Sequence, residues 1–259
     1  MKPPRPAIPK PKSNPQKKVG LARALSKLGF CSRTQAIELI REGKLRLNSG
    51  PVRNPETPVR LGVDRIEVAG QLVGAAGKIY LMMNKPRGIV TTASDEKGRD
   101  TVYSLLPQEM EWLAPVGRLD KASEGLLLLT NDSAWAARIT DPATHLDKTY
   151  HVQVGAVASE AMLEKLRHGV ESEKGELLRA KKAELLRSGG KNSWVELVLE
   201  EGKNRQIRRM FDALGVEVLR LIRVSIGPLQ LGDLAKGAHR PLRPDEKILI
   251  DQAMAKRIH

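Results

Sequence analysis

The chain has 259 residues, of which 41% are hydrophobic and 29% charged, a balance typical of a globular protein with one large or two unequal domains. No apolar run reaches the roughly 18–20 residues of a membrane helix, and the N-terminus lacks the apolar core of a secretory signal, so we expect a cytoplasmic protein. The single cysteine, Cys31, excludes an internal disulfide and a paired-cysteine zinc site, and with it the zinc-dependent base deaminases.

The net charge of +14 is unevenly distributed along the chain. Residues 1–77 hold 15 Lys and Arg against 5 Asp and Glu, a net of +10, and residues 78–259 account for the remaining +4. This asymmetry favours an N-terminal third that binds a polyanion, followed by a part of the chain whose positive and negative charges nearly balance. Net charge informs about binding partners rather than about the fold. A basic protein with no nucleic-acid partner is the alternative.

Residues 1–18 contain six prolines, six basic residues and no acidic residue. Proline removes backbone donors and like charges repel, so this segment is predicted to be a disordered basic arm. It either contacts phosphates or is a solvated tail.

Residues 19–74 are predicted to form a small α+β domain. A first helix carries leucines at positions 21, 25 and 28 and ends at Gly29, and Ser32-Arg-Thr-Gln35 fits the capping box of a second helix that stops at Gly43. Alternating residues predict strands at 45–47 and 66–68. The basic side chains left outside, which we expect to contact folded RNA, are Arg23, Lys27, Arg33, Arg41, Lys44 and Arg46.

After a linker at 75–77, residues up to 259 are predicted to form a larger α+β domain on a mixed or antiparallel sheet. Four successive leucines, 126–129, indicate a strand covered on both faces. Residues 84–88 are predicted to form a turn. Strands are predicted at 79–83, 89–92, 113–116, 125–130, 149–154, 194–199 and 216–224, and helices at 133–139, 159–167 and 204–214.

The segment Gly117–Asp132 carries the strongest chemical signal. A loop with Arg118 and Asp120 leads directly into the leucine strand. A carboxylate fixed at the edge of a rigid core has the geometry of a nucleophile or base. On physical grounds alone, we favour a loop ion pair or a turn cap as the explanation of these two residues.

This segment, G-R-L-D-x-x-x-E-G-L-L-L-L-T-N-D, resembles the active-site motif of pseudouridine synthases, in the branch of stand-alone enzymes that modify ribosomal RNA. Three further motifs occur in the expected order: Asn84-Lys85-Pro86-x-Gly88, Asp147–Tyr150 and Glu201–Phe211. The sequence departs from the family at Asp147, where glutamate is commoner, and at Ser133–Trp135, where a glycine usually follows.

Residues 25–48 resemble the small RNA-binding domain first seen in a small-subunit ribosomal protein, the ribosomal-protein-S-four type. The match comprises L-x-K-x-G-x-x-S-R-x-x-A at Leu25–Ala36 and I-x-x-G-x-L-x-L-N at Ile40–Asn48. The family usually has an uninterrupted Asn-Gly turn where this chain has residues 48–51, so a slightly longer hairpin is expected.

The resemblance implies that Asp120 is the catalytic carboxylate. It would either attack the ribose anomeric carbon, giving a covalent ester, or remove a ribose proton, giving a glycal. In both cases the uracil detaches and rejoins through carbon 5, which requires no metal or other cofactor. The absence of a Gly-rich phosphate loop from the sequence agrees with this expectation.

The resemblance also implies roles for other residues. Tyr150 would stack on the uracil, Arg208 would pair with Asp120 and keep it ionised, and Leu221 would form an apolar wall. Arg118 would hold the flipped nucleotide's phosphate or fill the vacated stack. Further substrate or RNA contacts are expected from Lys85 and Arg205. Without the family, Tyr150 is equally well a half-buried strand residue, and a solvated basic face explains Arg205, Arg208 and Arg209, an interpretation we favour for Arg209.

Two rivals stay open at this stage. A non-catalytic RNA-binding ribosome-assembly factor on the same fold would have no need of Asp120, Tyr150 and Arg208 together. An RNA methyltransferase or hydrolase would need a cofactor loop or metal ligands, and the five histidines are scattered. We expect a monomer acting on a ribosomal RNA hairpin, and the longer basic arm favours the large subunit.

Overall fold

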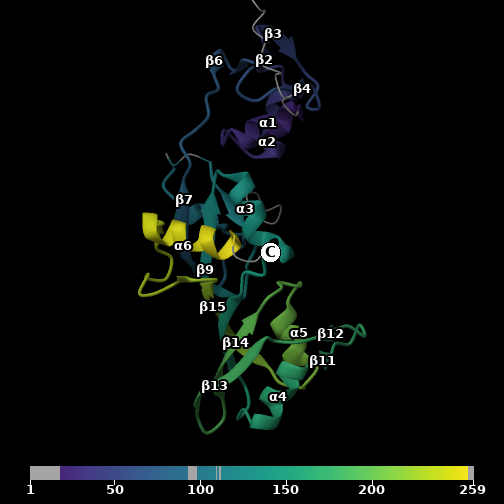
Figure 1. Ribbon diagram of the computed structural model, residues 1–259, viewed down its shortest axis with the longest axis vertical. Helices are drawn as coiled ribbons and strands as arrows, with labels where there is room; N and C mark the ends of the chain where they lie inside the picture. Colours follow the sequence, from purple (N-terminus) through teal and green to yellow (C-terminus); the bar gives the residue numbers. More distant parts are fainter. Residues whose placement is uncertain (1–17, 93–97, 109, 111, 256–259) are drawn as a thin grey trace, which may run out of the picture. The chain divides into compact units, whose positions relative to one another are not determined.

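The computed structural model describes residues 18–92, 98–108, 110 and 112–255. Within these residues no helix is both long enough and apolar enough to span a membrane. The chain divides after Ala76 into two compact units, an N-terminal unit and a C-terminal unit (Figure 1). The predicted basic arm lies outside the described residues except for Lys18.

The N-terminal unit packs two short helices on a small antiparallel sheet. Helix α1 spans Leu21–Lys27 and α2 spans Arg33–Arg41. Ser32 and Gln35 form the predicted capping box, with the side chain of each accepting a hydrogen bond from the backbone N–H of the other. The four-stranded sheet has the order β3 (Gly50–Val52), β2 (Leu45–Leu47), β5 (Ile66–Val68), β6 (Gln71–Leu72), and β1 (Val19–Gly20) pairs separately with β4 (Pro58–Val59).

The β2–β3 hairpin corrects one prediction. Leu47 pairs directly with Gly50, so the loop has only two residues, Asn48 and Ser49, with φ of +49° and +69°. Positive φ at both central positions is the geometry of a type I′ turn, which matches the twist of the strands. The expectation of a longer hairpin was wrong because Ser49 adopts the left-handed conformation that glycine commonly supplies.

The C-terminal unit contains a mixed nine-stranded sheet within the described residues. Its main path is β13-β14-β10-β15-β9-β7-β17, with β8 on β9 and β16 on β15. All pairs are antiparallel except β9 with β15, so the expected mixed sheet is confirmed. The strands are β7 Tyr80–Lys85, β8 Ala114–Val116, β9 Glu124–Thr130, β10 Lys148–Val154, β13 Lys182–Ser188, β14 Ser193–Leu199, β15 Val218–Ile226, β16 Leu229–Gln230 and β17 His239–Pro241. A separate ribbon pairs β11 (Val170–Glu171) with β12 (Leu177–Leu178).

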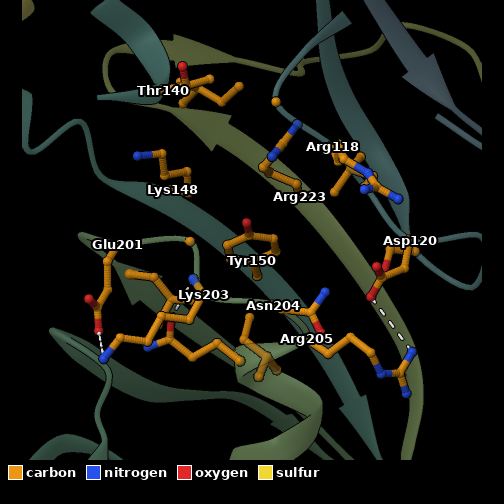
Figure 2. A pocket seen from close by; sticks show the side chains of 18 of the residues that line it. Arg118, Asp120, Thr140, Lys148, Tyr150, Glu201, Lys203, Asn204, Arg205 and Arg223 are labelled. Atoms are coloured by element: carbon orange, nitrogen blue, oxygen red, sulfur yellow. Dashed lines mark hydrogen bonds and ion pairs between the residues drawn. The ribbon is translucent and has the colours of Figure 1, made fainter. Parts of the chain in front are cut away.

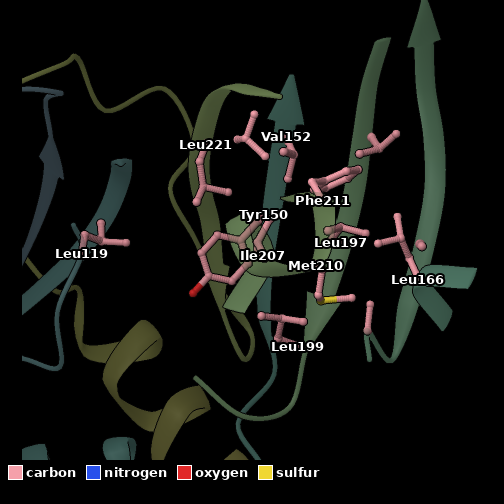
Figure 3. Close-up of a cluster of buried hydrophobic side chains, with 14 of the residues drawn as sticks. Leu119, Tyr150, Val152, Leu166, Leu197, Leu199, Ile207, Met210, Phe211 and Leu221 are labelled. Carbon is pink, nitrogen blue, oxygen red and sulfur yellow. The ribbon is translucent and has the colours of Figure 1, made fainter. Parts of the chain in front are cut away.

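Strand β9 pairs with β7, β8 and β15, and every residue in it is buried. Leu127 and Leu129 belong to a core under α4 (Glu160–His168) and α5 (Gln206–Asp212), part of which Figure 3 shows. Leu126 and Leu128 point to the opposite face, into a second core under α3 (Ser133–Thr140) and α6 (Pro244–Ala255) (Figure 1). The prediction of a leucine strand covered on both faces is confirmed.

Other boundaries differ from the predictions for local reasons. The strand expected at 89–92 reduces to a single parallel bridge between Val90 and Thr101. The turn expected at 84–88 begins later, because β7 continues through Lys85. The edge strand β13 was not predicted, since all but two of its residues are exposed and it has no apolar alternation. Short 3-10 turns occur at Val102–Leu105 and Pro142–Thr144.

Candidate active site

A cavity of about 550 Å³ opens on the face of the sheet that carries Tyr150. Its walls come from the 117–120 loop, from β10 and β15, and from the 201–207 segment (Figure 2). Of the residues predicted to form the site, the cavity is lined by Arg118, Asp120, Tyr150, Arg205 and Leu221. Residues far apart in the sequence are thus brought together around one space large enough for a nucleoside.

The Asp120 loop is fixed by its backbone. The hydroxyl of Thr91 donates to the carbonyl of Leu119 at 2.8 Å, and the N–H of Ser123 donates to the carbonyl of Asp120 at 2.9 Å. The Asp120 side chain itself is 36% exposed, and its Oδ2 lies 3.7 Å from Nη1 of Arg205. The carboxylate therefore faces the cavity from a rigid support, which is what a reacting group requires.

Lys85 does not have the position predicted for an RNA contact. Its side chain is fully buried, and Nζ donates to the carbonyls of Pro86 at 3.1 Å, Asp120 at 3.2 Å and Ser123 at 2.9 Å. Burial lowers the pKa of Lys85 to about 8. The prediction was wrong because this lysine ends the buried strand β7, where it holds the Asp120 loop from behind.

Gly125, at the start of the leucine run, is explained by a close approach of two strands. It has φ of +103° and pairs with Arg223 of the parallel strand β15. A Cβ added at Gly125 would lie 2.3 Å from the Arg223 carbonyl oxygen and 2.8 Å from its nitrogen. Only glycine lets β15 reach the end of the Asp120 loop.

Arg208 also differs from its predicted contact. Its guanidinium donates to the carbonyls of Val218 at 3.2 Å and Ala122 at 3.1 Å, and its Nε is buried without a hydrogen-bond partner. Burial lowers the pKa of Arg208, while Asp120 acts in the opposite direction. The ion-pair partner of Asp120 is Arg205, at the N-cap of α5, and Arg208 supports the same loop through Ala122.

Arg209 is not the solvated basic residue that we favoured. It donates to the hydroxyl of Ser172 at 3.0 Å and forms an ion pair with Glu176 at 2.5 Å. Hydrogen bonds from Arg209 and Lys203 lower the pKa of Glu176. Arg209 thus joins α5 to the β11–β12 ribbon.

Tyr150 and Leu221 form the apolar part of the cavity. Tyr150 is 9% exposed, and in Figure 3 its ring extends from the cluster with the hydroxyl pointing away from the other side chains. Leu221 lies on the neighbouring strand β15 and is 7% exposed. A flat ring beside a branched apolar side chain suits a planar base.

The basic residues of the N-terminal unit are placed largely as predicted. Arg33 and Arg41 are exposed. Lys44 is exposed but forms an ion pair with Glu42 at 2.7 Å, and Arg46 donates to the Ser49 carbonyl across the hairpin turn. Arg23 is also exposed and Lys27 is half-buried.

Two cations, Lys148 and Arg223, are among the cavity residues that had no predicted role. Lys148 stands in the Asp147–Tyr150 motif, and Arg223 is a charged residue in the otherwise largely apolar end of β15. The signal available in the sequence was an arginine at a position that strand alternation places in the core. Arg223 is indeed 6% exposed.

Comparison with known protein families gives two matches. The family model described as RNA pseudouridylate synthase matches residues 79–213, and the S4 domain model matches residues 19–64.

Similar proteins cover most of the chain. The ribosomal large subunit pseudouridine synthase B of Bacillus subtilis is 39% identical over 87% of this chain and 93% of its own length. An uncharacterized RNA pseudouridine synthase of Aquifex aeolicus is 36% identical over 88% of this chain and 92% of its own. A crystal structure of a pseudouridylate synthase, 30% identical, superposes with a TM-score of 0.64 over 90% of this chain and 99% of its own.

Proposed function

The chain belongs to the RNA pseudouridine synthase family, and from that membership we propose that it isomerises a uridine of ribosomal RNA with Asp120 as the catalytic carboxylate. The observation that carries the assignment of Asp120 is its position. It is a partly exposed carboxylate on a backbone-fixed loop, facing the same cavity as Tyr150. A purely structural loop aspartate would not need that cavity.

Asp120 initiates the reaction in one of two ways. Its carboxylate attacks C1′ of the ribose and displaces uracil, or it removes the C2′ proton as uracil leaves. Both routes require an ionised carboxylate. Arg205 places a positive charge 3.7 Å from Oδ2 of Asp120.

The remaining residues bind and position the nucleotide. The target base leaves its stack to reach the cavity, where Tyr150 and Leu221 hold its ring. Arg118 is exposed at the cavity and binds the phosphate of the extruded nucleotide. Arg208 positions the catalytic loop through the Ala122 carbonyl, 3.1 Å away.

The substrate is a hairpin of ribosomal RNA bound by a monomer. The exposed basic side chains of the N-terminal unit, including Arg33 and Arg41, bind its phosphates. The similar Bacillus subtilis protein is named for the large ribosomal subunit, which supports a large-subunit target and the cytoplasm as the site of action.

The test is pseudouridine mapping on ribosomal RNA from cells with the wild-type gene, with the gene deleted, and with Asp120→Asn. One or more pseudouridines should be lost in the deletion and stay lost with the variant. Purified Asp120→Asn should unfold at the wild-type urea concentration and bind the mapped fragment with unchanged affinity, because Asn is nearly isosteric. Full activity in Asp120→Asn would overturn the catalytic assignment.

A second variant separates phosphate binding from chemistry. Arg118→Ala should slow isomerisation of structured RNA and weaken its binding. The slope of the logarithm of the binding constant against the logarithm of the salt concentration should fall in magnitude by about one. Unchanged activity on structured RNA would exclude the proposed role of Arg118.

A further inference from the structure

Arg223 is a nearly buried cation that lines the cavity. Its Nε donates to the carbonyl of Leu126 at 2.8 Å, while Nη2 is buried without a hydrogen-bond partner. An unpaired charge and an unsatisfied donor at such depth are costly, unlike a guanidinium at the surface. A site of this kind suits a ligand that brings negative charge.

Lys148 is a second cation on the same cavity wall. Burial and the charge of Arg223 both lower the pKa of Lys148. Its Nζ donates to the carbonyl of Glu200 at 3.5 Å, and the neighbouring Asp147 pairs instead with Lys181 at 2.9 Å. Across the described ranges, neither Lys148 nor Arg223 forms an ion pair with a carboxylate.

The two cations line the cavity on either side of Tyr150 along the sheet: Arg223 comes from β15, which lies between β10 and β9, and Lys148 comes from β10 itself. Arg223 is the direct register partner of Tyr150, and Lys148 comes two residues before it on β10. Figure 2 shows the ring of Tyr150 between Lys148 and the Asp120–Arg205 pair, with its hydroxyl directed to the side of Lys148 and Arg223. A uracil stacked on Tyr150 with its ribose at Asp120 would therefore occupy the cavity that both cations line.

We propose that Lys148 and Arg223 form a cationic subsite that stabilises the uracil as a departing anion. This inference rests on the proposed function. When the N1–C1′ bond breaks, its electron pair stays on N1 and spreads over O2 and O4. C1′ gains a bond to the Asp120 oxygen in the ester route, and in the glycal route C2′ loses its proton to Asp120. In the ester route C5 then attacks C1′ and displaces the Asp120 oxygen, and in the glycal route C5 bonds to C1′ as Asp120 returns the proton to C2′. In both routes C5 loses its proton and N1 takes one up, so the net reaction is an isomerisation.

The depth of the subsite favours a base over a phosphate. Arg118 and Arg205 are exposed and suit the RNA backbone, whereas Arg223 is 6% exposed. Fixed donors in a water-poor site are most effective where charge develops during the reaction. The subsite thus acts on the transition state more than on the bound substrate.

The main test uses Lys148→Met, because Lys148 is only half-buried and donates one long hydrogen bond. Single-turnover rate constants and dissociation constants are measured on the mapped ribosomal RNA fragment over a range of salt. We expect a rate about 10²-fold lower, by analogy with the loss of one fixed donor. Affinity and its salt slope should stay at wild-type values, and Lys148→Arg should recover much of the rate.

A chemical control varies the leaving group. In RNA with 6-azauridine at the target position, the departing base is a stronger acid and needs less stabilisation. The rate deficit of Lys148→Met should therefore shrink with this substrate. Lys165→Met, on the exposed surface of α4, is the matched lysine control and should match wild type with both RNAs.

Arg223→Lys keeps a positive charge but loses the planar guanidinium, so it should be slower with unchanged affinity. Circular dichroism and urea unfolding report whether it folds.

If Lys148→Met instead weakens binding, flattens the salt slope and leaves the rate unchanged, the subsite holds a phosphate and the proposal is wrong. If wild type isomerises the fragment and Lys148→Met equals it, only the subsite fails. If wild type modifies no ribosomal RNA, the proposed function itself fails.

Discussion

Replacing Lys85 by Met tests whether the catalytic loop is held by a buried cation. The substitution keeps the length of the side chain and removes the ammonium that bridges the carbonyls of Pro86, Asp120 and Ser123. Hydrogen bonds from a charged group contribute about 1.5–3 kcal/mol each, so three amount to about 4.5–9 kcal/mol. Eliminating the buried charge offsets several kcal/mol of this loss. We expect a net destabilisation of about 2–4 kcal/mol.

The pH dependence of that destabilisation has a definite sign. Burial lowers the pKa of Lys85 from 10.5 to about 8, so between these values the unfolded chain binds more protons than the folded chain. The stability of the wild type relative to Lys85→Met should therefore rise as the pH increases from about 8 to 10.5. Below pH 8 both states are protonated and the difference should be flat.

The assays are urea unfolding at pH 7 and pH 9.5 and single-turnover isomerisation at pH 7. A shift of the Asp120 carboxylate by about 1 Å can lower the rate on the order of 100-fold, with binding little changed. Lys121→Met, on the exposed neighbour, controls for the loss of a lysine and should keep wild-type stability. A Lys85→Met protein with wild-type stability and rate would refute the idea that this lysine holds the loop.

Three further substitutions probe the fold. Gly125→Ala should lower the free energy of unfolding by about 3 kcal/mol or more, because the added Cβ would lie 2.3 Å from the Arg223 carbonyl oxygen. Urea unfolding measures the change, and an unchanged midpoint would contradict the close approach of the two strands. Ser32→Ala should lower the stability of helix α2 against local unfolding by about 1 kcal/mol. Hydrogen exchange should then be roughly fivefold faster at the amides of residues 33–41. The pKa of Glu246 is lowered to about 2 by Arg240, so Glu246→Gln should destabilise at pH 7 by about 1–3 kcal/mol. That difference should fade as the pH drops from about 4.5 to 2, and a constant difference would exclude the linkage.

The sequence predicts best where one local signal dominates. The four leucines at 126–129 have no polar alternative and can only form a strand covered on both sides, as observed. The capping box at Ser32 is equally local, because both of its hydrogen bonds join residues three positions apart. Helix α6 was missed even though Pro244 followed by acidic residues is a start signal, since its apolar residues give no clear amphipathic face.

Contacts between distant side chains were predicted less well. Lys85, Arg208 and Arg209 are all basic residues in motifs associated with RNA, and sequence alone could not show which ones point inward. Lys85 is buried by its place at the end of β7, whereas Arg209 is half-buried and pairs with the Glu176 carboxylate 33 residues earlier in the chain. Such orientation depends on pairing between strands and on the direction of a helix face, which no local pattern specifies.

The motif around Asp120 combines two physical tasks. Arg118 and Asp120 face the cavity, whereas Glu124 is buried and holds Arg220 at 3.1 Å and Lys236 at 2.6 Å. Because Gly125 has no side chain, β15 and its residue Arg223 can pack against the end of the loop. Much of what looks like active-site sequence is therefore the support that keeps one carboxylate in place. Substitutions at Glu124 should accordingly affect stability and rate together, whereas Asp120→Asn should affect the rate alone.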